Sequence, residues 1–201
     1  MDAPSWAEAV SRMRSCTRCS LAEGRRNVVV YRGSPSPWVV FLGEAPGAKE
    51  DELGRPFVGR AGRLLDAAIE TLAIPEDSYG ITNVIMCRPP GNVFDPEAAR
   101  ACRPWLDLKL ELLSPKIVVT LGSSALHALD PAAGPLARLS GETREWSGGT
   151  LFPLLHPAAT FHRRAYREQW DRDVARLKDL LPQWIPAGTK GEPAGALLTP
   201  V

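Results

Sequence analysis

A chain of 201 residues suits one domain of ordinary size with a proper hydrophobic core. It has no run of eighteen apolar residues, so we expect no membrane span and no membrane association. The net charge of +1 gives no indication of a nucleic-acid partner by itself. Because the N-terminus lacks the basic and apolar regions of a signal peptide, we expect a cytoplasmic protein.

The basic residues are unevenly distributed, and most of them are arginine. They cluster in 12–18, 25–26, 55–63 and 163–167. Guanidinium groups match the geometry of phosphate oxygens, which favours a nucleic-acid partner. A genome rich in arginine codons, combined with solvated surfaces, gives the same pattern, so charge alone does not decide between the two.

Apolar periodicity predicts strands and helices that alternate along the chain. In chain order we expect a helix over 5–15, a short strand over 28–31, a strand over 38–42, a helix over 60–72, a strand over 79–87, a helix over 95–114, a strand over 116–122, a helix over 123–129, a strand over 151–155 and a helix over 163–181. This alternation predicts a mostly parallel sheet with helices on both faces. We expect one domain over 1–185.

Two further segments are expected to lack regular core structure. Residues 130–149 look irregular, with room for an edge hairpin around Gly148-Gly149. After Pro182 the composition turns to proline, glycine and alanine, and we predict a disordered tail over 186–201.

The segment 43–62 follows the buried strand 38–42 and reads GEAPGAKEDELGRPFVGRAG. Its five glycines and two prolines argue against a regular backbone. Open α/β sheets bind their ligands at the carboxyl ends of strands, and glycines let backbone N–H groups approach a ligand. One aromatic residue and four carboxylates stand in the same loop: Phe57, Glu44, Glu50, Asp51 and Glu52. An ordered surface loop without a ligand is the alternative.

Polar side chains that are distant in sequence fall at the ends of other expected strands, Asn83 near one and His156 after another. With Phe57 and the backbone N–H groups of 43–47 they would form a pocket for a flat polar ring. An asparagine amide accepts one hydrogen bond and donates another, a pattern that uracil offers at N3–H and O4 and that cytosine reverses. A histidine near O2 would stabilise charge on a departing base. Taken singly, Asn83 is more often a satisfied core group, and His156 a turn residue.

The chain has four cysteines, two of them in a C-x2-C spacing: Cys16, Cys19, Cys87 and Cys102. Structural zinc usually pairs two such spacings, whereas here the second pair is widely split. Four thiolates from distant elements favour a [4Fe–4S] cluster. Zinc, a redox pair and four unrelated buried thiols remain open. A cluster would tie the N-terminal segment to the middle of the chain.

Taken together, the four-cysteine pattern, GEAPG followed by EDELGRPFVGRAG, ITN at 81–83 and HPAA at 156–159 resemble the family 4 uracil-DNA glycosylases, over roughly 16–181. The resemblance implies a three-layer α/β/α sandwich with a central four-stranded parallel sheet. It implies a [4Fe–4S] cluster on the four cysteines. It also implies removal of uracil from DNA, single- or double-stranded, as the first step of base excision repair. We expect the protein to act as a monomer.

The same resemblance assigns roles to particular residues. Contacts to uracil fall to Gly43, Glu44, Ala45, Phe57, Asn83 and His156, and catalysis to His156 together with Glu44 or Glu50, one of which would orient the attacking water. Contacts to DNA are expected from Arg55, Arg60, Thr160, Phe161, Arg163 and Arg164.

The sequence departs from related glycosylases at several positions. Ala45 stands where the best-known uracil glycosylases carry an aspartate that positions water. Gly47 replaces a tyrosine that excludes the methyl group of thymine, and Glu50 is expected to fill that space. Thr160 stands where a leucine wedge enters the DNA stack, so Phe161 is expected to act instead. The segment 88–95 contains no histidine, so we expect no covalent link to DNA.

The expected mechanism is base flipping followed by cleavage of the glycosidic bond, with His156 and loop N–H groups stabilising the departing uracil anion. Two alternatives stay open. A catalytically silent relative would bind uracil-containing or damaged DNA, a reading that Ala45 permits. An electron-transfer or small-ligand protein would use the glycine loop for a phosphate, but the loop has neither GxGxxG nor a Walker lysine–serine pair.

Overall fold

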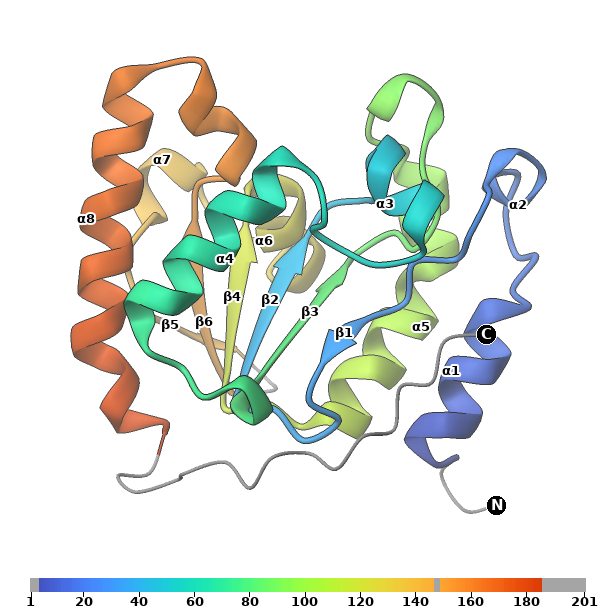
Figure 1. Ribbon diagram of the computed structural model, residues 1–201, viewed down its shortest axis with the longest axis horizontal. Coiled ribbons are helices and arrows are strands. Elements are labelled where there is room, and N and C mark those ends of the chain that lie inside the picture. The colour runs from blue at the N-terminus through green and yellow to red at the C-terminus, as the bar shows by residue number, and fades with distance from the viewer. Residues whose placement is uncertain (1–3, 147–148, 186–201) are drawn as a thin grey trace.

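The computed structural model describes residues 4–146 and 149–185 (Figure 1). The expected tail over 186–201 and Gly148 of the expected hairpin lie outside the described residues. Among the helices of the described ranges, none is both long and apolar enough to cross a bilayer.

A six-stranded mixed sheet forms the centre of the fold, in the order β1-β3-β2-β4-β6-β5. The strands are β1 (Arg32–Gly33), β2 (Val39–Gly43), β3 (Tyr79–Asn83), β4 (Ile117–Leu121), β5 (Arg144–Trp146) and β6 (Gly149–Leu154). The pairs β3–β2, β2–β4 and β4–β6 are parallel, and the edge strands β1 and β5 pair antiparallel with their neighbours. The sheet is therefore larger than the four-stranded parallel sheet that the resemblance implied, because both edges gain a short antiparallel strand.

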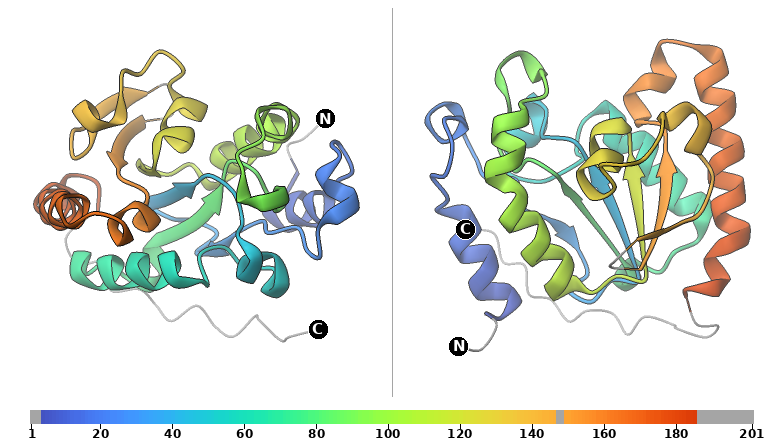
Figure 2. Two further views of the ribbon diagram at one scale, coloured as in Figure 1. Left: turned by 90° about the horizontal axis from the view of Figure 1, so that it is seen from above. Right: turned by 180° about the vertical axis from the view of Figure 1, so that it is seen from behind.

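Helices cover both faces of this sheet, as the alternation predicted (Figure 2). They are α1 (Trp6–Arg14), α2 (Leu21–Gly24), α3 (Ala48–Leu53), α4 (Arg60–Leu72), α5 (Pro96–Leu113), α6 (Ser123–Leu129), α7 (Leu136–Leu139) and α8 (Arg164–Leu180), with short 3-10 turns η1 (Glu76–Ser78), η2 (Pro90–Asn92), η3 (Pro157–Phe161) and η4 (Leu181–Gln183). Along β2, Val40 and Leu42 pack against α1, α5 and α6, whereas Val39 and Phe41 pack against α4 and α8. This period of two places one apolar layer on each face.

Capping residues in the sequence fix where two of these helices begin. The hydroxyl of Ser5 accepts from the N–H of Glu8, whose carboxylate accepts from the N–H of Ser5, so α1 begins with a capping box. Asp95 accepts from the first free N–H groups of α5, and Pro96 occupies its first turn.

The predicted strand over 28–31 is wrong, because the two-residue strand β1 lies just beyond it. The segment does run beside 84–87, where the N–H of Val29 donates to the carbonyl of Met86 at 2.8 Å. The carbonyl of Val30, however, accepts from the hydroxyl of Thr82 at 2.8 Å. The Thr82 side chain therefore occupies the acceptor that a continuous ladder of backbone hydrogen bonds would use.

The loop over 43–62 contains a short helix that the glycine and proline count did not predict. Helix α3 begins after Gly47 and ends at Gly54, whose φ of 68° provides the left-handed C-cap. Within 130–149, which we expected to be irregular apart from an edge hairpin, the short helix α7 forms, and β5 pairs antiparallel with β6 at the edge of the sheet. In the first segment, Gly47 and Gly54 lie at the two ends of α3.

The predicted strand over 79–87 ends early, at Asn83. Beyond it the chain bends, and Val84 and Ile85 donate to the carbonyls of Gly43 and Glu44 at 2.9 Å each. Asn83 therefore stands at the carboxyl end of β3. The carboxyl ends of β2, β3, β4 and β6 lie at the upper edge in Figure 1, beside α3, η2, η3 and the start of α4.

Candidate active site

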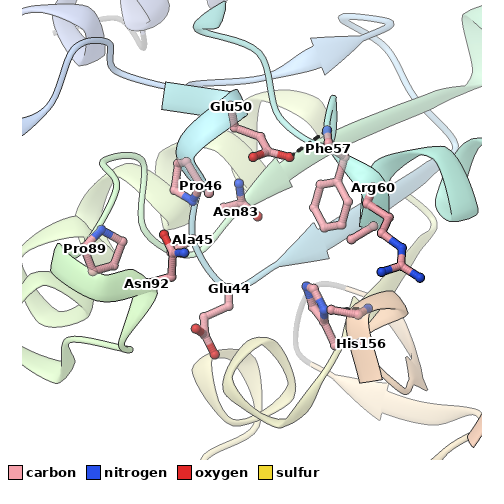
Figure 3. Close-up of a pocket in the computed structure, with 14 residues that line it drawn as sticks. Glu44, Ala45, Pro46, Glu50, Phe57, Arg60, Asn83, Pro89, Asn92 and His156 are labelled. Carbon is pink, nitrogen blue, oxygen red and sulfur yellow. Dashed lines mark hydrogen bonds between the residues drawn. The ribbon is translucent and has the colours of Figure 1, made fainter. Parts of the chain in front are cut away.

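A pocket of about 390 Å³ opens at this edge of the sheet (Figure 3). Its volume lies in the range of ligand pockets, about 300–1,000 Å³. Its walls come from five segments, namely 44–50, 57–61, Asn83, 89–92 and 156–158. The structure therefore brings Phe57, Asn83 and His156 together, as the strand-end argument predicted.

Asn83 is almost completely buried, with 1% of its surface exposed. It pairs in register with Gly43 on β2. A Cβ atom on Gly43 would clash with Asn83 Oδ1 and with the Phe57 ring, so only glycine lets the amide and the ring approach so closely. Among the described residues Asn83 Oδ1 has no hydrogen-bond partner. A buried polar atom without a partner is costly, so we read it as a group prepared for a ligand.

Phe57 is held in an unusual backbone conformation, with a φ of 54°. This left-handed region is strained for a bulky side chain and costs about 1–3 kcal/mol. Its carbonyl lies against Gly62, where a Cβ atom would collide with it. The Phe57 ring lies 6.0 Å from that of His156 at an angle of 36° (Figure 3). One aromatic face is thus fixed beside the imidazole.

His156 lies two residues beyond the end of β6 and caps the start of η3. Its Nδ1 accepts a hydrogen bond from the N–H of Ala158 at 3.2 Å. Burial lowers the pKa of His156, while the carboxylates of Glu44 and, more weakly, Glu50 raise it. The ring is therefore assigned as neutral, with Nδ1 an acceptor and the proton on Nε2. A neutral imidazole in this tautomer offers one N–H donor.

Two carboxylates of the loop line the pocket from different sides. Glu44 accepts from the hydroxyl of Ser124 on α6 at 2.6 Å, and in Figure 3 its carboxylate points away from Asn83. Glu50 Oε1 accepts from the N–H of Gly59 at 3.0 Å. Its other oxygen lies beside Gly47, where it would meet an added Cβ at 2.8 Å. The space that Gly47 leaves is thus occupied by the Glu50 side chain.

The residues expected to contact DNA comprise two arginines that lie over aromatic rings, two other exposed arginines, and a buried threonine next to Phe161. Arg60 lines the pocket and stacks on Phe161, with the guanidinium carbon 4.0 Å from the ring centroid. Arg163 lies over Tyr166 at 5.4 Å. Arg55 is exposed outside the pocket, and the exposed Arg164 donates to Glu168 at 2.8 Å. Thr160 is buried instead, and its hydroxyl donates to the carbonyl of Pro157.

The four cysteines gather where the N-terminal segment meets α5. Burial raises the pKa of Cys87 and of Cys102, and the charge of Cys19 raises both further. The indole N–H of Trp105 donates to Cys16 Sγ at 3.1 Å, and Arg25 donates to Cys87 Sγ at 3.3 Å. Donors aimed at sulfur suit thiolate ligands, which carry negative charge.

These residues fit an iron–sulfur cluster in number, chemistry and surroundings. Cys87 and Cys102 are buried among apolar residues, and Cys19 packs against the same core. No three metal-binding side chains in 4–146 and 149–185 are placed to hold a single ion as they stand.

Two residues of this region were not singled out by the sequence. Ser124 holds Glu44, and Lys109 lies fully buried behind Asn83. Lys109 left a signal in the sequence, because it occupies a position on the apolar stripe of its helix, whereas Ser124 depends on how segments distant in sequence are placed. Pro89 and Asn92, which also line the pocket, belong to the loop 88–92 that follows the strand expected over 79–87.

The sequence of this chain is similar to those of known proteins. The family model of the Uracil DNA glycosylase superfamily matches residues 30–179. The chain is 38% identical over 177 residues to a type-4 uracil-DNA glycosylase of Sulfurisphaera tokodaii, which covers 83% of this chain and 80% of the relative. It is also 38% identical over 157 residues to a type-4 uracil-DNA glycosylase of Thermotoga maritima, covering 77% and 82%. A type-5 uracil-DNA glycosylase of Thermus thermophilus is 32% identical over 148 residues, covering 65% and 66%.

The match over most of the chain decides the class, and the chain belongs to the uracil DNA glycosylase superfamily. Within that class its similarity is to the type-4 uracil-DNA glycosylases, as the sequence motifs implied.

Proposed function

We propose that this protein is a uracil-DNA glycosylase that releases free uracil from DNA and leaves an abasic site. Membership of the family supports the reaction. One observation supports this pocket as the active site: an amide oxygen without a partner among the described residues, an aromatic face and a neutral histidine lie together in it. Uracil within a duplex is out of reach of such a pocket, so the base must be flipped out first.

Base recognition is proposed for Asn83 and Phe57. The Asn83 amide would accept from N3–H with its unpartnered Oδ1 and donate to O4. The Phe57 ring would stack on the base, with Gly43 and Ala45 close to its edge. Glu50 would fill the space beside the C5 position, where thymine carries a methyl group.

Cleavage places negative charge on the departing ring, and His156 is proposed to stabilise it. The neutral imidazole would donate Nε2–H to O2, as its tautomer allows. One such donor is typically worth about 3–4 kcal/mol in the transition state. No proton transfer from a cationic histidine is needed, which agrees with the lowered pKa of His156.

A water molecule then adds to the sugar carbon, and Glu44 is proposed to orient it. Of the two carboxylates, Glu44 raises the pKa of His156 more than Glu50 does, as expected of the nearer group. The O2 side of uracil adjoins the glycosidic bond, so a carboxylate near His156 lies close to the attacked carbon. Ser124 holds this carboxylate in place.

The DNA would be held by arginines around the pocket mouth. Arg60 and Arg163 stack on aromatic rings, and no described carboxylate pairs with either, so their N–H groups can meet phosphates. Arg55 and Arg164 would add to this charge. Phe161 is proposed as the wedge, because the side chain of Thr160 is buried whereas Phe161 is only half-buried.

The cofactor proposed for this protein is a [4Fe–4S] cluster held by Cys16, Cys19, Cys87 and Cys102. When bound, it would cross-link the N-terminal segment to α5 and carry a reducible charge close to them. The residues of this chain that would act on it are Arg25 and Trp105, through the sulfur atoms to which they donate.

The test uses purified full-length protein and an oligonucleotide with a single uracil. We expect free uracil, together with a strand that alkali cleaves at the uracil position, and no cleavage of a matched oligonucleotide with thymine. Tight binding to uracil-containing DNA without release of the base would instead make the protein a silent relative and overturn the proposal.

A further inference from the structure

A fully buried lysine lies directly behind the base pocket. Lys109 has 0% of its surface exposed and belongs to α5, on the face that packs against the sheet. Burying an ammonium group is expensive unless hydrogen bonds compensate, and burial lowers the pKa of Lys109 to about 8. In the part of the chain that the structure describes, no carboxylate pairs with it. A leucine at this position would fill the core without that cost.

The ammonium group is held by two groups at the end of β3. Its Nζ donates to Thr82 Oγ1 at 2.6 Å and to the carbonyl oxygen of Asn83 at 3.0 Å. The Thr82 hydroxyl in turn donates a hydrogen bond to the carbonyl of Val30 at 2.8 Å. A continuous chain of hydrogen bonds therefore runs from α5 through the tip of β3 to the segment beside it.

This contact occurs at the last paired residue of β3. The paired register between β2 and β3 ends at Gly43 and Asn83, and the chain bends at the next residue. The peptide that follows Asn83 is therefore held from two sides, because the N–H of Val84 donates to the carbonyl of Gly43 at 2.9 Å and Lys109 donates to the carbonyl of Asn83. The backbone conformation of Asn83 determines the direction of its Cα–Cβ bond. Holding this carbonyl in place therefore also helps to orient the side-chain amide.

The other end of Asn83 faces the pocket, where its Oδ1 lacks a partner among the described residues. Gly43 and the Phe57 ring leave the amide little freedom. We propose that Lys109 is a positioning residue for base recognition, which holds the Asn83 backbone so that the amide meets the uracil edge without the ammonium touching the base. This inference rests on the proposed function.

The test is a double-mutant cycle on single-turnover uracil release. Lys109→Met keeps an unbranched side chain that is one heavy atom shorter, and it removes the donors. We expect it to slow release by about 10- to 100-fold in the wild-type background, since small misplacements of a reacting group have effects of this size. In the Asn83→Ala background the same change should slow release by less than about threefold, because the group that Lys109 positions is already absent.

Two controls separate positioning from stability. Thr120→Val removes another fully buried hydroxyl of the central sheet, outside the pocket, and should leave the rate unchanged. Lys109→Gln repeats the cycle if the methionine variant does not fold, as judged by thermal unfolding. An equal loss of rate in both backgrounds, or no loss in either, would overturn the role of Lys109. A wild-type protein that releases no uracil would overturn the proposed function instead.

Discussion

At the scale of single residues, the pocket depends on a few groups whose conformation or protonation is costly. Phe57 adopts a positive φ, Asn83 buries an unpartnered oxygen, and His156 stays neutral against two carboxylates. Such exceptions to ordinary packing concentrate at functional sites. The sequence motifs indicated these three residues. The backbone strain and the burial of polar groups, however, are evident only from the structure.

The protonation state of His156 leads to a prediction about pH. Because burial lowers the pKa of His156 below its ordinary value of 6.5, the neutral ring should persist at neutral pH. We expect the rate of uracil release to stay constant from about pH 8 to about pH 6.5 and to fall only at lower pH. A rate that rises as the pH falls through 6.5 would show that a cationic histidine acts instead.

The same shift affects stability, and its sign can be stated. Below about pH 6.5 the unfolded chain binds a proton at this histidine that the folded protein binds less readily, so the free energy of unfolding should decrease as the pH falls. In His156→Gln this part of the decrease should vanish, as measured by urea denaturation at about pH 7.5 and 5.5. The control is His127→Gln, since His127 lies on α6 outside the pocket.

At the scale of elements, α5 links the two ends of the site. It carries Cys102 and, two turns later, Lys109, while Trp105 between them donates to Cys16 from the N-terminal segment. A single helix therefore contacts both the proposed cluster and the tip of β3. The sequence predicted the helix and its cap. The donors to sulfur were not predictable, since they depend on how the N-terminal segment lies across the helix.

The contact between Trp105 and Cys16 leads to a prediction for the cluster. Hydrogen bonds to ligating sulfur stabilise the more negative, reduced state. We expect Trp105→Phe to lower the reduction potential by up to about 40 mV, which corresponds to roughly one hydrogen bond of about 1 kcal/mol. Voltammetry of the purified protein measures this change.

The matched control for this variant is Trp6→Phe. Trp6 lies on α1 and packs edge-on against Tyr31 with ring centroids 5.0 Å apart, and in the described part of the chain its indole donates no hydrogen bond to sulfur. The reduction potential of the Trp6→Phe variant should equal that of the wild type. An equal shift in both variants would mean that packing, not the hydrogen bond, sets the potential. A colourless protein that holds zinc would contradict the cluster itself.

At the scale of the whole molecule, the parallel strands carry the site. Because β2, β3 and β6 all end at one edge, residues far apart in sequence meet there (Figure 1). Alternation of strands and helices was enough to predict this, since parallel strands have a common carboxyl edge. The edge strand β1 was missed because it has only two residues, too few for a periodic signal, whereas β5 lies at the edge hairpin for which the sequence left room.

The parts of the site that the sequence did not predict share one physical cause. Local pattern identifies a residue by its own neighbours, whereas Ser124 and Lys109 act through groups on other elements. Similarly, Thr160 was expected at the DNA surface, yet the turn of η3 directs it inward and leaves Phe161 against Arg60.

The central claim is that one pocket both recognises and releases uracil, and single-turnover release from a uracil-containing oligonucleotide tests it most directly. We predict that Asn83→Ala and His156→Ala each lower the rate by at least about 100-fold, as expected for loss of one transition-state donor, while His127→Ala keeps the wild-type rate. Full rates in both pocket variants would contradict the account.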